Sequence, residues 1–363
     1  MRVAHYLPYL LGHDTGSGNA GRGWCAALVD RGVEVVAITD RSVNDRPPPD
    51  GVSTVRVAHS LAGPLRIPMA TGDAFDGADV VVVHGGWVLG NIVIGRACQN
   101  ARIPFVITTH GAYAPEVWRR RKAAKLAWAS LIERRHVASA AAIHVFFPEE
   151  GSTVVRSMQA RPAMLVAPNG ITPPEGVIWD GGSGGYLLWL GRFDVETKGL
   201  DLLIRAIAYI PRSQRLALRL HGPDWRGGKS RLQSLVHEVG VQSSVDIMDP
   251  AYGDEKWELI RKARGFVYPS RWDACPVAVS EAAAVGVPTL VGPYPLGSLL
   301  RAKHAAVQVD SNVSSLARGL GELISPDAGE LGWRASQVAK EALSWEAVSR
   351  SWLNQVTALL ENR

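Results

Sequence analysis

The sequence predicts an α/β protein with two doubly wound parallel sheets, each covered by helices on both faces. Short runs of β-branched and apolar residues alternate with helix-length segments through both halves of the chain, which is the pattern of consecutive βαβ units. The 363 residues are enough for about two domains. A stretch rich in proline and glycine at 168–185 separates the two series. We therefore predict an N-terminal domain at 1–170 and a C-terminal domain at 171–340.

The first half begins with a strand and alternates from there. A helix-like segment at 20–31 ends at Gly32 and leads into the second strand. An apolar crossover segment around 92–98 separates two strands that are rich in β-branched residues. The strands that we expect in this half are 3–7, 33–39, 80–84, 105–109 and 141–146.

The second half repeats the alternation after the glycine-rich stretch. The expected strands are 186–190, 216–221, 245–248, 265–268 and 289–291. The expected helices are 200–210, 229–239, 254–263 and 278–285. Parallel strands joined by crossover helices have this spacing.

Composition excludes several classes of protein. The hydrophobic fraction of 47% and the charged fraction of 20% are those of a globular protein. No apolar run reaches the length of a membrane span, and residues 1–10 lack the features of a signal peptide, so we expect a cytoplasmic protein. Cys25, Cys98 and Cys275 follow neither a disulfide nor a zinc spacing. We expect reduced thiols and no metal site.

A GxGxxG pattern is formed by Gly16, Gly18 and Gly21, and Asp40 follows at the end of the second strand. In dinucleotide-binding proteins such glycines form the turn between strand and helix, and an acidic residue binds the ribose. Here residues 8–15 intervene after the strand, which favours a long loop. Three interpretations stay open: a loop facing another anionic ligand, a simple turn, and the NAD site of an oxidoreductase.

Two cations follow the strand predicted at 186–190. Arg192 and Lys198 lie in the segment GRFDVETKG before the next helix. Ligands of open α/β sheets bind beyond the carboxyl ends of the strands. An Arg and a Lys beside a helix N-terminus can hold a diphosphate there. The alternative is a pair of solvated cations on a loop.

Two carboxylates follow the strand predicted at 265–268. Asp273 lies in the loop, and we expect Glu281 in the first turn of the next helix, near its positive end. One carboxylate can accept hydrogen bonds from a ribose while the other binds a second sugar. The alternative is a cap or a structural ion pair.

The order of these motifs resembles that of glycosyltransferase family 4. The matching segments are TTHG, PNG, GRFDVETKGLDLLIRAI and YPSRWDACPVAVSEAAAVGVPTLVG. The resemblance implies a GT-B fold, with two Rossmann-like domains facing across a cleft and a last helix at 341–363 returning to the first domain. It also implies a retaining transferase that uses a nucleotide diphosphate sugar.

The resemblance assigns the donor site. It implies that Arg192 and Lys198 contact the diphosphate, that Glu281 contacts the ribose, and that Asp273 positions the donor sugar. Asp273 stands where the family motif begins with glutamate, so its carboxylate is withdrawn by one methylene. The identity of the donor sugar therefore stays open.

The resemblance also assigns residues of the first domain. His110 corresponds to the family's active-site histidine, and its place at the carboxyl end of a strand favours ligand contact over a core role. Gly16 and Gly18 correspond to a glycine-rich loop near the donor phosphate and the acceptor. We predict His110 as catalytic, together with Arg192, Lys198 and Asp273 in the other domain.

A basic segment at 118–137 carries the cations Arg119, Arg120, Arg121 and Lys122. Many family members that act on lipid-linked acceptors carry a basic amphipathic helix in this domain, and clustered cations bind anionic lipid. The apolar residues that we expect on one helical face are Val117, Ala124, Trp128 and Leu131. The alternative is a solvated helix face.

The predicted function is transfer of a sugar from a nucleotide diphosphate donor to an acceptor hydroxyl, in polysaccharide or glycolipid biosynthesis. No DxD triplet occurs, so we expect neither a metal ion nor another cofactor. The expected partners are the nucleotide sugar, a glycan or lipid-linked acceptor and an anionic membrane surface, but no nucleic acid, because the net charge is only +5. The alternatives are a soluble small-molecule acceptor, an NAD-dependent oxidoreductase, and an inactive binding subunit.

Overall fold

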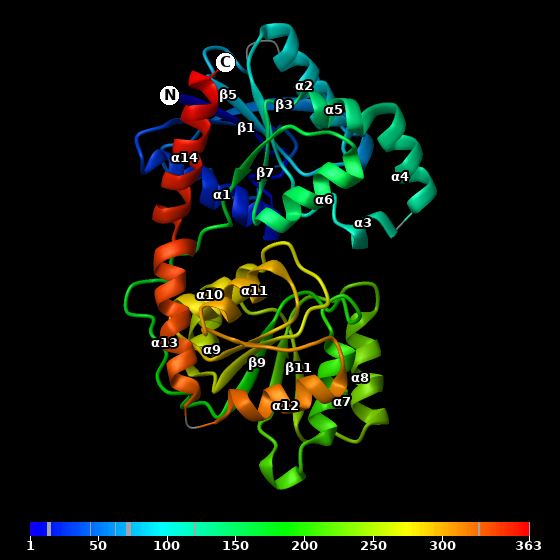
Figure 1. Cartoon of the computed structure of the whole chain (residues 1–363), viewed down its shortest axis with the longest axis vertical. Helices are drawn as coiled ribbons and strands as arrows, with labels where there is room; N and C mark the ends of the chain where they lie inside the picture. The colour runs from blue at the N-terminus through cyan, green and yellow to red at the C-terminus, as the bar shows by residue number, and fades with distance from the viewer. Residues whose placement is uncertain are drawn as a thin grey trace. The chain divides into compact units, whose positions relative to one another are not determined.

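The computed structural model describes residues 1–12, 16–43, 45–61, 63–69, 74–119, 121–325 and 327–362. The chain divides into two compact units. The N-terminal unit comprises Met1–Gly170 and Trp345–Arg363, and the C-terminal unit comprises Ile171–Ser344. Both are α/β units with helices on both faces of a sheet (Figure 1). The fold class predicted from the sequence is therefore confirmed.

In its described part, the N-terminal unit holds an eight-stranded sheet in the order β4-β3-β2-β1-β5-β6-β7-β8. Its pairs are parallel except for the antiparallel edge pair of β3 and β4. The strands are β1 (Arg2–Tyr6), β2 (Glu34–Asp40), β3 (Ser53–Ser60), β4 (Ile67–Met69), β5 (Val80–His84), β6 (Phe105–Thr108), β7 (Ala142–Val145) and β8 (Ala163–Val166). Polar residues and a proline occupy β3 and β4, so this pair lacks the apolar runs from which the central strands were predicted. The strand β8, at the opposite edge of the sheet, was not predicted either.

The helices of this unit connect the strands and cover both faces of the sheet. They are α1 (Gly16–Val29), the 3₁₀ turn η1 (Gly63–Leu65), α2 (Leu89–Ala101), α3 (Pro115–Arg119), α4 (Lys122–Trp128), the π-helical turn η2 (Ala129–Glu133), α5 (Arg134–Ser139), α6 (Pro148–Met158) and α14 (Trp345–Glu361). The last helix thus begins at Trp345, four positions after the predicted start at 341.

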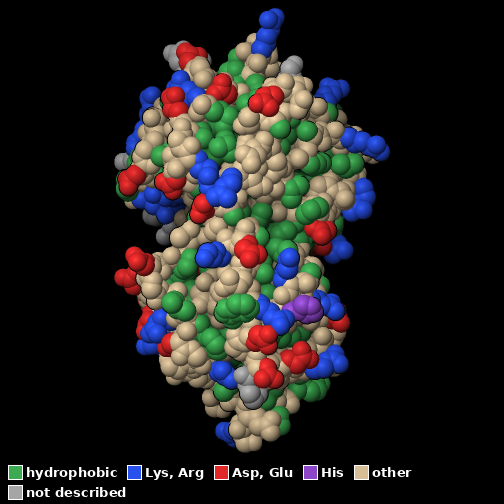
Figure 2. All heavy atoms as spheres, turned by 60° about the vertical axis from the view of Figure 1, so that its left-hand side comes forward, with side chains coloured by type: hydrophobic (Ala, Val, Ile, Leu, Met, Phe, Trp, Pro, Cys, Tyr) green, Lys and Arg blue, Asp and Glu red, His purple; other side chains and the backbone are tan. Residues whose placement is uncertain are grey.

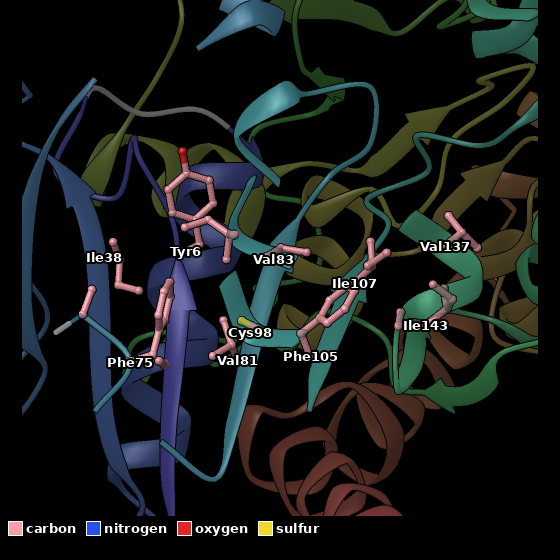
Figure 3. Packing of buried hydrophobic residues seen from close by; sticks show 14 of the residues in the cluster. Tyr6, Ile38, Phe75, Val81, Val83, Cys98, Phe105, Ile107, Val137 and Ile143 are labelled. Atoms are coloured by element: carbon pink, nitrogen blue, oxygen red, sulfur yellow. The ribbon is translucent and has the colours of Figure 1, made fainter. Parts of the chain in front are cut away.

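Alternate residues of the central strands enter two cores, one on each face of the sheet. On one face Tyr6, Val81 and Val83 pack with Phe105 (Figure 3). On the other face α14 packs beside α1 (Figure 1). A Cβ on Gly23 would lie 2.0 Å from the ring of Trp345, so glycine is needed in α1 for the close approach of the last helix.

In its described part, the C-terminal unit holds a six-stranded parallel sheet in the order β11-β10-β9-β12-β13-β14. The strands are β9 (Tyr186–Leu190), β10 (Ala217–His221), β11 (Val245–Met248), β12 (Gly265–Tyr268), β13 (Thr289–Val291) and β14 (Val307–Gln308). The helices are α7 (Leu200–Tyr209), η3 (Arg212–Gln214), α8 (Gly228–Glu238), α9 (Gly253–Lys262), α10 (Val277–Val285), α11 (Pro295–Ala302), α12 (Val313–Leu323), α13 (Ala328–Val338) and the π-helical turn η4 (Ala339–Leu343).

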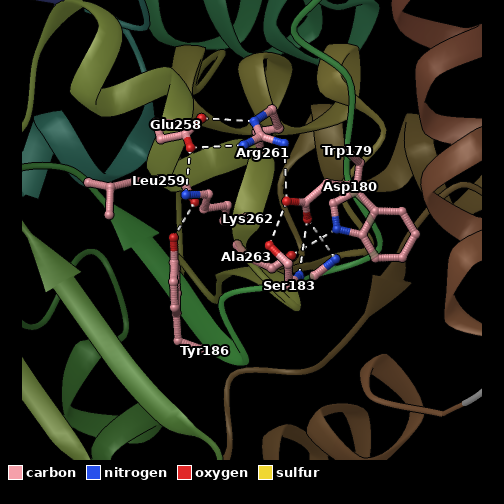
Figure 4. Close-up of polar contacts among 10 residues, drawn as sticks. Trp179, Asp180, Ser183, Tyr186, Glu258, Leu259, Arg261, Lys262 and Ala263 are labelled. Atoms are coloured by element: carbon pink, nitrogen blue, oxygen red, sulfur yellow. Dashed lines mark hydrogen bonds and ion pairs between the residues drawn. The ribbon is translucent and has the colours of Figure 1, made fainter.

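The glycine-rich stretch before β9 is fixed to the C-terminal unit. The Asp180 carboxylate accepts hydrogen bonds from the backbone amide and hydroxyl of Ser183 and forms an ion pair with Arg261 at 3.1 Å (Figure 4). The Trp179 indole donates to the carbonyl oxygen of Ala263 at 2.8 Å. Local hydrogen bonds and contacts with Arg261 and Ala263 therefore hold a segment that the sequence marks only as loop.

The surface mixes both signs of charge. On the face drawn in Figure 2, Lys and Arg side chains alternate with Asp and Glu side chains over both units. Cys25, Cys98 and Cys275 are buried thiols. In the described part of the chain, no helix combines the length and the apolar character needed to cross a membrane.

Candidate active site

Two loops of the C-terminal unit meet at the carboxyl ends of neighbouring strands. β9 and β12 are adjacent and parallel, so the loops that follow them lie on the same edge of the sheet. A Cβ on Gly199 would lie 2.2 Å from the carbonyl oxygen of Pro269, so only glycine permits this approach. The Ser270 hydroxyl and the Arg271 amide donate to the carbonyl oxygen of Thr197 at 2.9 and 3.0 Å. The two loops therefore form one framework.

This framework brings two of the predicted residues together. The Nζ atom of Lys198 lies 2.5 Å from Oδ2 of Asp273, and the Tyr268 hydroxyl donates to the same oxygen at 3.0 Å. Lys198 is buried, and its Nζ lies 5.4 Å from the centre of the Tyr268 ring. Burial and the neighbouring Asp273 carboxylate raise the pKa of Tyr268 well above its ordinary value, so this hydroxyl keeps its proton and donates. Tyr268 was missed from the sequence, where it reads as the last residue of a buried strand.

Arg192 shares the first loop with Lys198 but is exposed. Its guanidinium lies 4.6 Å from the ring centre of Trp225, a cation–π contact. Trp225 belongs to the loop after β10, which passes so close that a Cβ on Gly222 would lie 1.7 Å from the carbonyl oxygen of Gly191. The sequence did not indicate Trp225, because the two loops are distant in sequence and become neighbours through the pairing of β9 with β10.

Glu281 is buried in the second turn of α10, so the prediction that it lies in the first turn is wrong. The helix begins at Val277, directly after Pro276, because proline is tolerated only at a helix start. Oε1 of Glu281 forms an ion pair with Nζ of Lys256 in α9 at 2.6 Å. Burial raises the pKa of Glu281, and the neighbouring Lys256 acts against that rise. Lys256 is a second residue that the sequence analysis missed.

In the N-terminal unit, His110 follows β6 in a tight turn. His110 and Gly111 both have positive φ, 47° and 72°. The carboxylate of Glu150 holds this turn: its Oε1 accepts from the Thr109 hydroxyl at 2.5 Å and from the Gly111 amide at 3.1 Å, and its Oε2 accepts from the Phe146 amide. Burial raises the pKa of Glu150, whereas these hydrogen bonds act to lower it. Glu150 therefore positions the backbone that carries His110.

His110 ends a hydrogen-bonded series of three imidazoles. Nδ1 of His5 lies 3.0 Å from Nε2 of His84, and Nδ1 of His84 lies 2.9 Å from Nε2 of His110. The three residues come from β1, β5 and the turn after β6, which are neighbours in the sheet. Burial lowers the pKa of His5 to about 3 and that of His110 to about 4. All three rings are therefore neutral near pH 7.

The predicted glycine-rich loop is the start of a helix. Gly16 is exposed and Gly18 buried in the first turn of α1, while residues 13–15 lie outside the described part of the chain. In a dinucleotide site the first glycine directly follows the strand, whereas β1 ends at Tyr6. Both oxygens of Asp40 are engaged, one by Ser42 and the other by Arg66 at 2.6 Å. The geometry does not fit an NAD site.

The basic segment is not one continuous amphipathic helix. It breaks between α3 and α4, where Arg121 has a φ of 56°, and Arg120 lies outside the described residues. Arg119, Arg121 and Lys122 are exposed, as are Leu126 and Leu131, at 44% and 69%. The expected apolar face is also wrong: Val117 and Trp128 are half-buried, whereas Ala124 and Leu131 face solvent.

A buried carboxylate fixes the inner side of this segment. Oε1 of Glu133 accepts from the Trp87 amide at 3.0 Å and from the Tyr113 hydroxyl at 2.7 Å, and Oε2 accepts from the Trp128 indole at 2.7 Å. The segment therefore has a packed inner side and an outer side that exposes cations beside aliphatic residues.

Comparison with known proteins identifies the family. A family model described as a glycosyl transferase 4-like domain matches residues 15–170, and one described as glycosyl transferases group 1 matches residues 184–326. Together the two models cover most of the chain and both units. The protein belongs to the glycosyltransferases of the family 4 type, and it is a transferase.

Individual relatives are distant. The chain is 23% identical over 312 residues to the GDP-mannose:cellobiosyl-diphosphopolyprenol alpha-mannosyltransferase of Xanthomonas oryzae pv. oryzae, covering 81% of this chain and 79% of that protein. Among solved structures, Anabaena HepE in complex with UDP-glucose superposes with a TM-score of 0.76 at 14% identity, covering 99% of this chain and 100% of the other. Sucrose-phosphate synthase from Thermosynechococcus elongatus superposes with a TM-score of 0.75 at 18% identity over 100% of both chains. The fold is GT-B.

Proposed function

We propose that the protein transfers a sugar, with retention of anomeric configuration, from a nucleotide diphosphate sugar to a hydroxyl of a glycan or lipid-linked acceptor. The observation that carries this proposal is the framework of the two loops after β9 and β12. It holds Lys198 against Asp273 and carries Arg192 on the same loop. A cationic pair beside a sugar-binding carboxylate suits a diphosphate sugar and its leaving group.

The observed contacts refine the roles of these residues. Arg192 reaches solvent beside Trp225, so it is the first cation that an incoming diphosphate meets. Lys198 is paired with Asp273, and a bound diphosphate would share that ammonium group. Glu281 is ion-paired with Lys256 and would accept hydrogen bonds from the ribose hydroxyls. The cations take over the neutralisation that a metal ion provides in other transferases, so activity in excess EDTA is expected to equal activity without it.

Donor identity is best tested by a panel of nucleotide sugars. GDP-mannose comes first, because it is the donor in the name of the Xanthomonas relative, and UDP-glucose comes second, because HepE binds it. We expect one donor to raise the melting temperature of the protein and to be hydrolysed slowly without acceptor. NMR of the transferred sugar then reports its anomeric configuration.

The same panel separates the alternatives. An inactive binding subunit would be stabilised by a nucleotide sugar without hydrolysing it, and an oxidoreductase would be stabilised by NAD instead. An inverted product would contradict the retaining mechanism while leaving the donor assignment intact. Transfer to a polyprenol diphosphate glycan, compared with transfer to soluble sugars, distinguishes the two acceptor classes.

A further inference from the structure

The imidazole series His5–His84–His110 has one buried end and one end that is partly exposed. At the inner end, Nε2 of His5 is buried and has no hydrogen-bond partner among the residues that the structure describes. At the outer end, His110 is half-buried, and Nδ1 is its only ring nitrogen outside the series. The fourth imidazole nearby, His144, does not join the series, because it is bonded to Thr108 and to the carbonyl oxygen of Ala167.

Hydrogen-bond logic allows two proton arrangements in such a series. A neutral imidazole carries one N–H and one bare nitrogen, so the choice made at His5 propagates through His84 to His110. If His5 carries its proton on Nε2, a buried N–H lacks an acceptor. If His5 carries it on Nδ1, each ring donates to the next, and a bare nitrogen is left at the buried end. Buried N–H groups without an acceptor are the rarer defect in proteins, so the second arrangement is favoured.

We propose that His5 and His84 are positioning residues that hold His110 in the tautomer with its proton on Nδ1, so that His110 meets its ligand as a neutral hydrogen-bond donor and not as a base. The tautomer follows from the contacts alone, whereas the role toward a ligand oxygen rests on the proposed glycosyl transfer. The series does not conduct protons through the unit, because its inner end at His5 is closed.

The tautomer can be read directly by NMR on the full chain with ¹⁵N-labelled histidine. One-bond N–H couplings distinguish a protonated Nδ1 from a protonated Nε2, and the spectrum of His110→Asn identifies the signals of His110. We expect the proton of His110 on Nδ1 and a bare Nε2. A proton on Nε2 in the wild-type protein would overturn the proposal, whatever the activity.

Two substitutions at one position test the role of His84. In His84→Asn, an amide nitrogen near the place of Nδ1 can still donate to His110, whereas in His84→Asp a carboxylate oxygen near that place can only accept. We expect the asparagine variant to keep the wild-type tautomer and activity within about threefold. We expect the aspartate variant to carry the proton of His110 on Nε2 and to lower kcat by roughly tenfold or more, since a wrong histidine tautomer impairs catalysis strongly.

His5→Asp repeats the test one step further from the active site, in case His84→Asp does not fold. An unchanged tautomer of His110 in a folded aspartate variant would show that the series does not set it and would overturn the proposal. A wild-type protein that has the expected tautomer but consumes no nucleotide sugar would support the tautomer and contradict the proposed function.

Discussion

Lys198 is the residue whose loss tests the donor site most directly. Its ammonium group contacts Asp273 and the face of Tyr268, and in the proposed reaction it neutralises the leaving diphosphate. Lys198→Ala removes this preorganised charge, so we expect turnover to fall by about 100-fold or more with the fold intact. Turnover with the best donor of the panel is the measurement.

Lys262→Ala is the matched control. Lys262 lies in the same unit and is also ion-paired, at 2.7 Å from Glu258, but it is half-buried at the end of α9, where 42% of its side chain is exposed. We expect its activity to equal that of the wild type. Activity of Lys198→Ala within a few-fold of the wild type would remove Lys198 from the mechanism.

Asp273 decides the donor sugar in this proposal. Its carboxylate is fixed by Lys198 at 2.5 Å and by Tyr268 at 3.0 Å. Asp273→Glu advances the carboxylate by one methylene, so we expect the ratio of kcat/KM between two donor sugars to change by roughly tenfold. The measurement compares the preferred donor with its epimers.

Asp201→Glu serves as the control for Asp273. Asp201 forms an ion pair with Arg271 at 2.7 Å in the same unit, so the change adds the same methylene outside the proposed sugar contact. We expect the donor ratio of this variant to stay as in the wild type. An unchanged ratio in Asp273→Glu would mean that the carboxylate does not select the sugar.

At the scale of elements, α3 and α4 expose cations beside aliphatic residues. Such a surface can bind an anionic membrane, and each cation near the lipid contributes about 1 kcal/mol of binding free energy. We expect the protein to co-sediment with anionic vesicles at low salt, and the double variant Arg119→Glu, Lys122→Glu to lose this binding. Binding should also weaken as the Debye length falls from ~10 Å at 0.1 M to ~3 Å at 1 M salt.

The double variant must keep its fold for this test to be informative. The hydrogen bonds of Glu133 hold the inner side of the segment, and neither substitution touches them, so we expect donor hydrolysis to continue. Arg301→Glu with Lys303→Glu, in the C-terminal unit, is the control with the same change of charge. Loss of vesicle binding in both double variants would mean that binding depends on the net charge of the protein and not on the surface of α3 and α4.

The sequence predicts that a helix or strand is present better than it predicts where that helix or strand ends. The segment 118–137 has helical composition throughout, but Arg121 adopts a left-handed conformation and divides it. The buried Glu133 carboxylate accepts hydrogen bonds from three parts of the chain. Periodicity alone cannot predict these contacts, because two of the donors lie 46 and 20 positions away from Glu133 in the sequence.

At the scale of the whole molecule, the two units differ in their response to acid. Burial lowers the pKa of several imidazoles in the N-terminal unit, namely His5, His59, His84, His110, His136 and His144. The C-terminal unit holds one described histidine with a lowered pKa, His221. Stability in mild acid therefore depends more strongly on pH in the N-terminal unit.

The sign of this dependence follows from proton binding. The ordinary pKa of histidine is 6.5, so the histidines of the unfolded chain bind protons below this pH. In the folded N-terminal unit, His110 and His144 bind protons only near pH 4. The free energy of unfolding is therefore highest above pH 6.5 and falls as the pH drops from 6.5 toward 4. Hydrogen exchange measured across this range should show the N-terminal unit losing protection first. Earlier loss in the C-terminal unit would contradict the prediction.

The sequence by itself determined the class of fold, and it indicated most of the residues of the proposed donor site. Periodic apolar runs specify parallel strands, and Arg192, Lys198 and Asp273 follow such runs directly. Their place at the edge of the sheet is a consequence of local order along the chain. The resemblance to a known family rests on the same local motifs.

Only the tertiary structure decided which groups hold these residues in place. Tyr268 contacts Lys198 and Lys256 contacts Glu281 from other strands and helices. Glu150 holds the backbone on both sides of His110, and the imidazole series joins β1 to β5 and to the turn after β6. These partners are far apart in the sequence and come together because parallel strands align their carboxyl ends. A strand residue such as His5 has no local feature that distinguishes it from a core histidine. Its role depends on which strands become neighbours, and long-range packing sets that order.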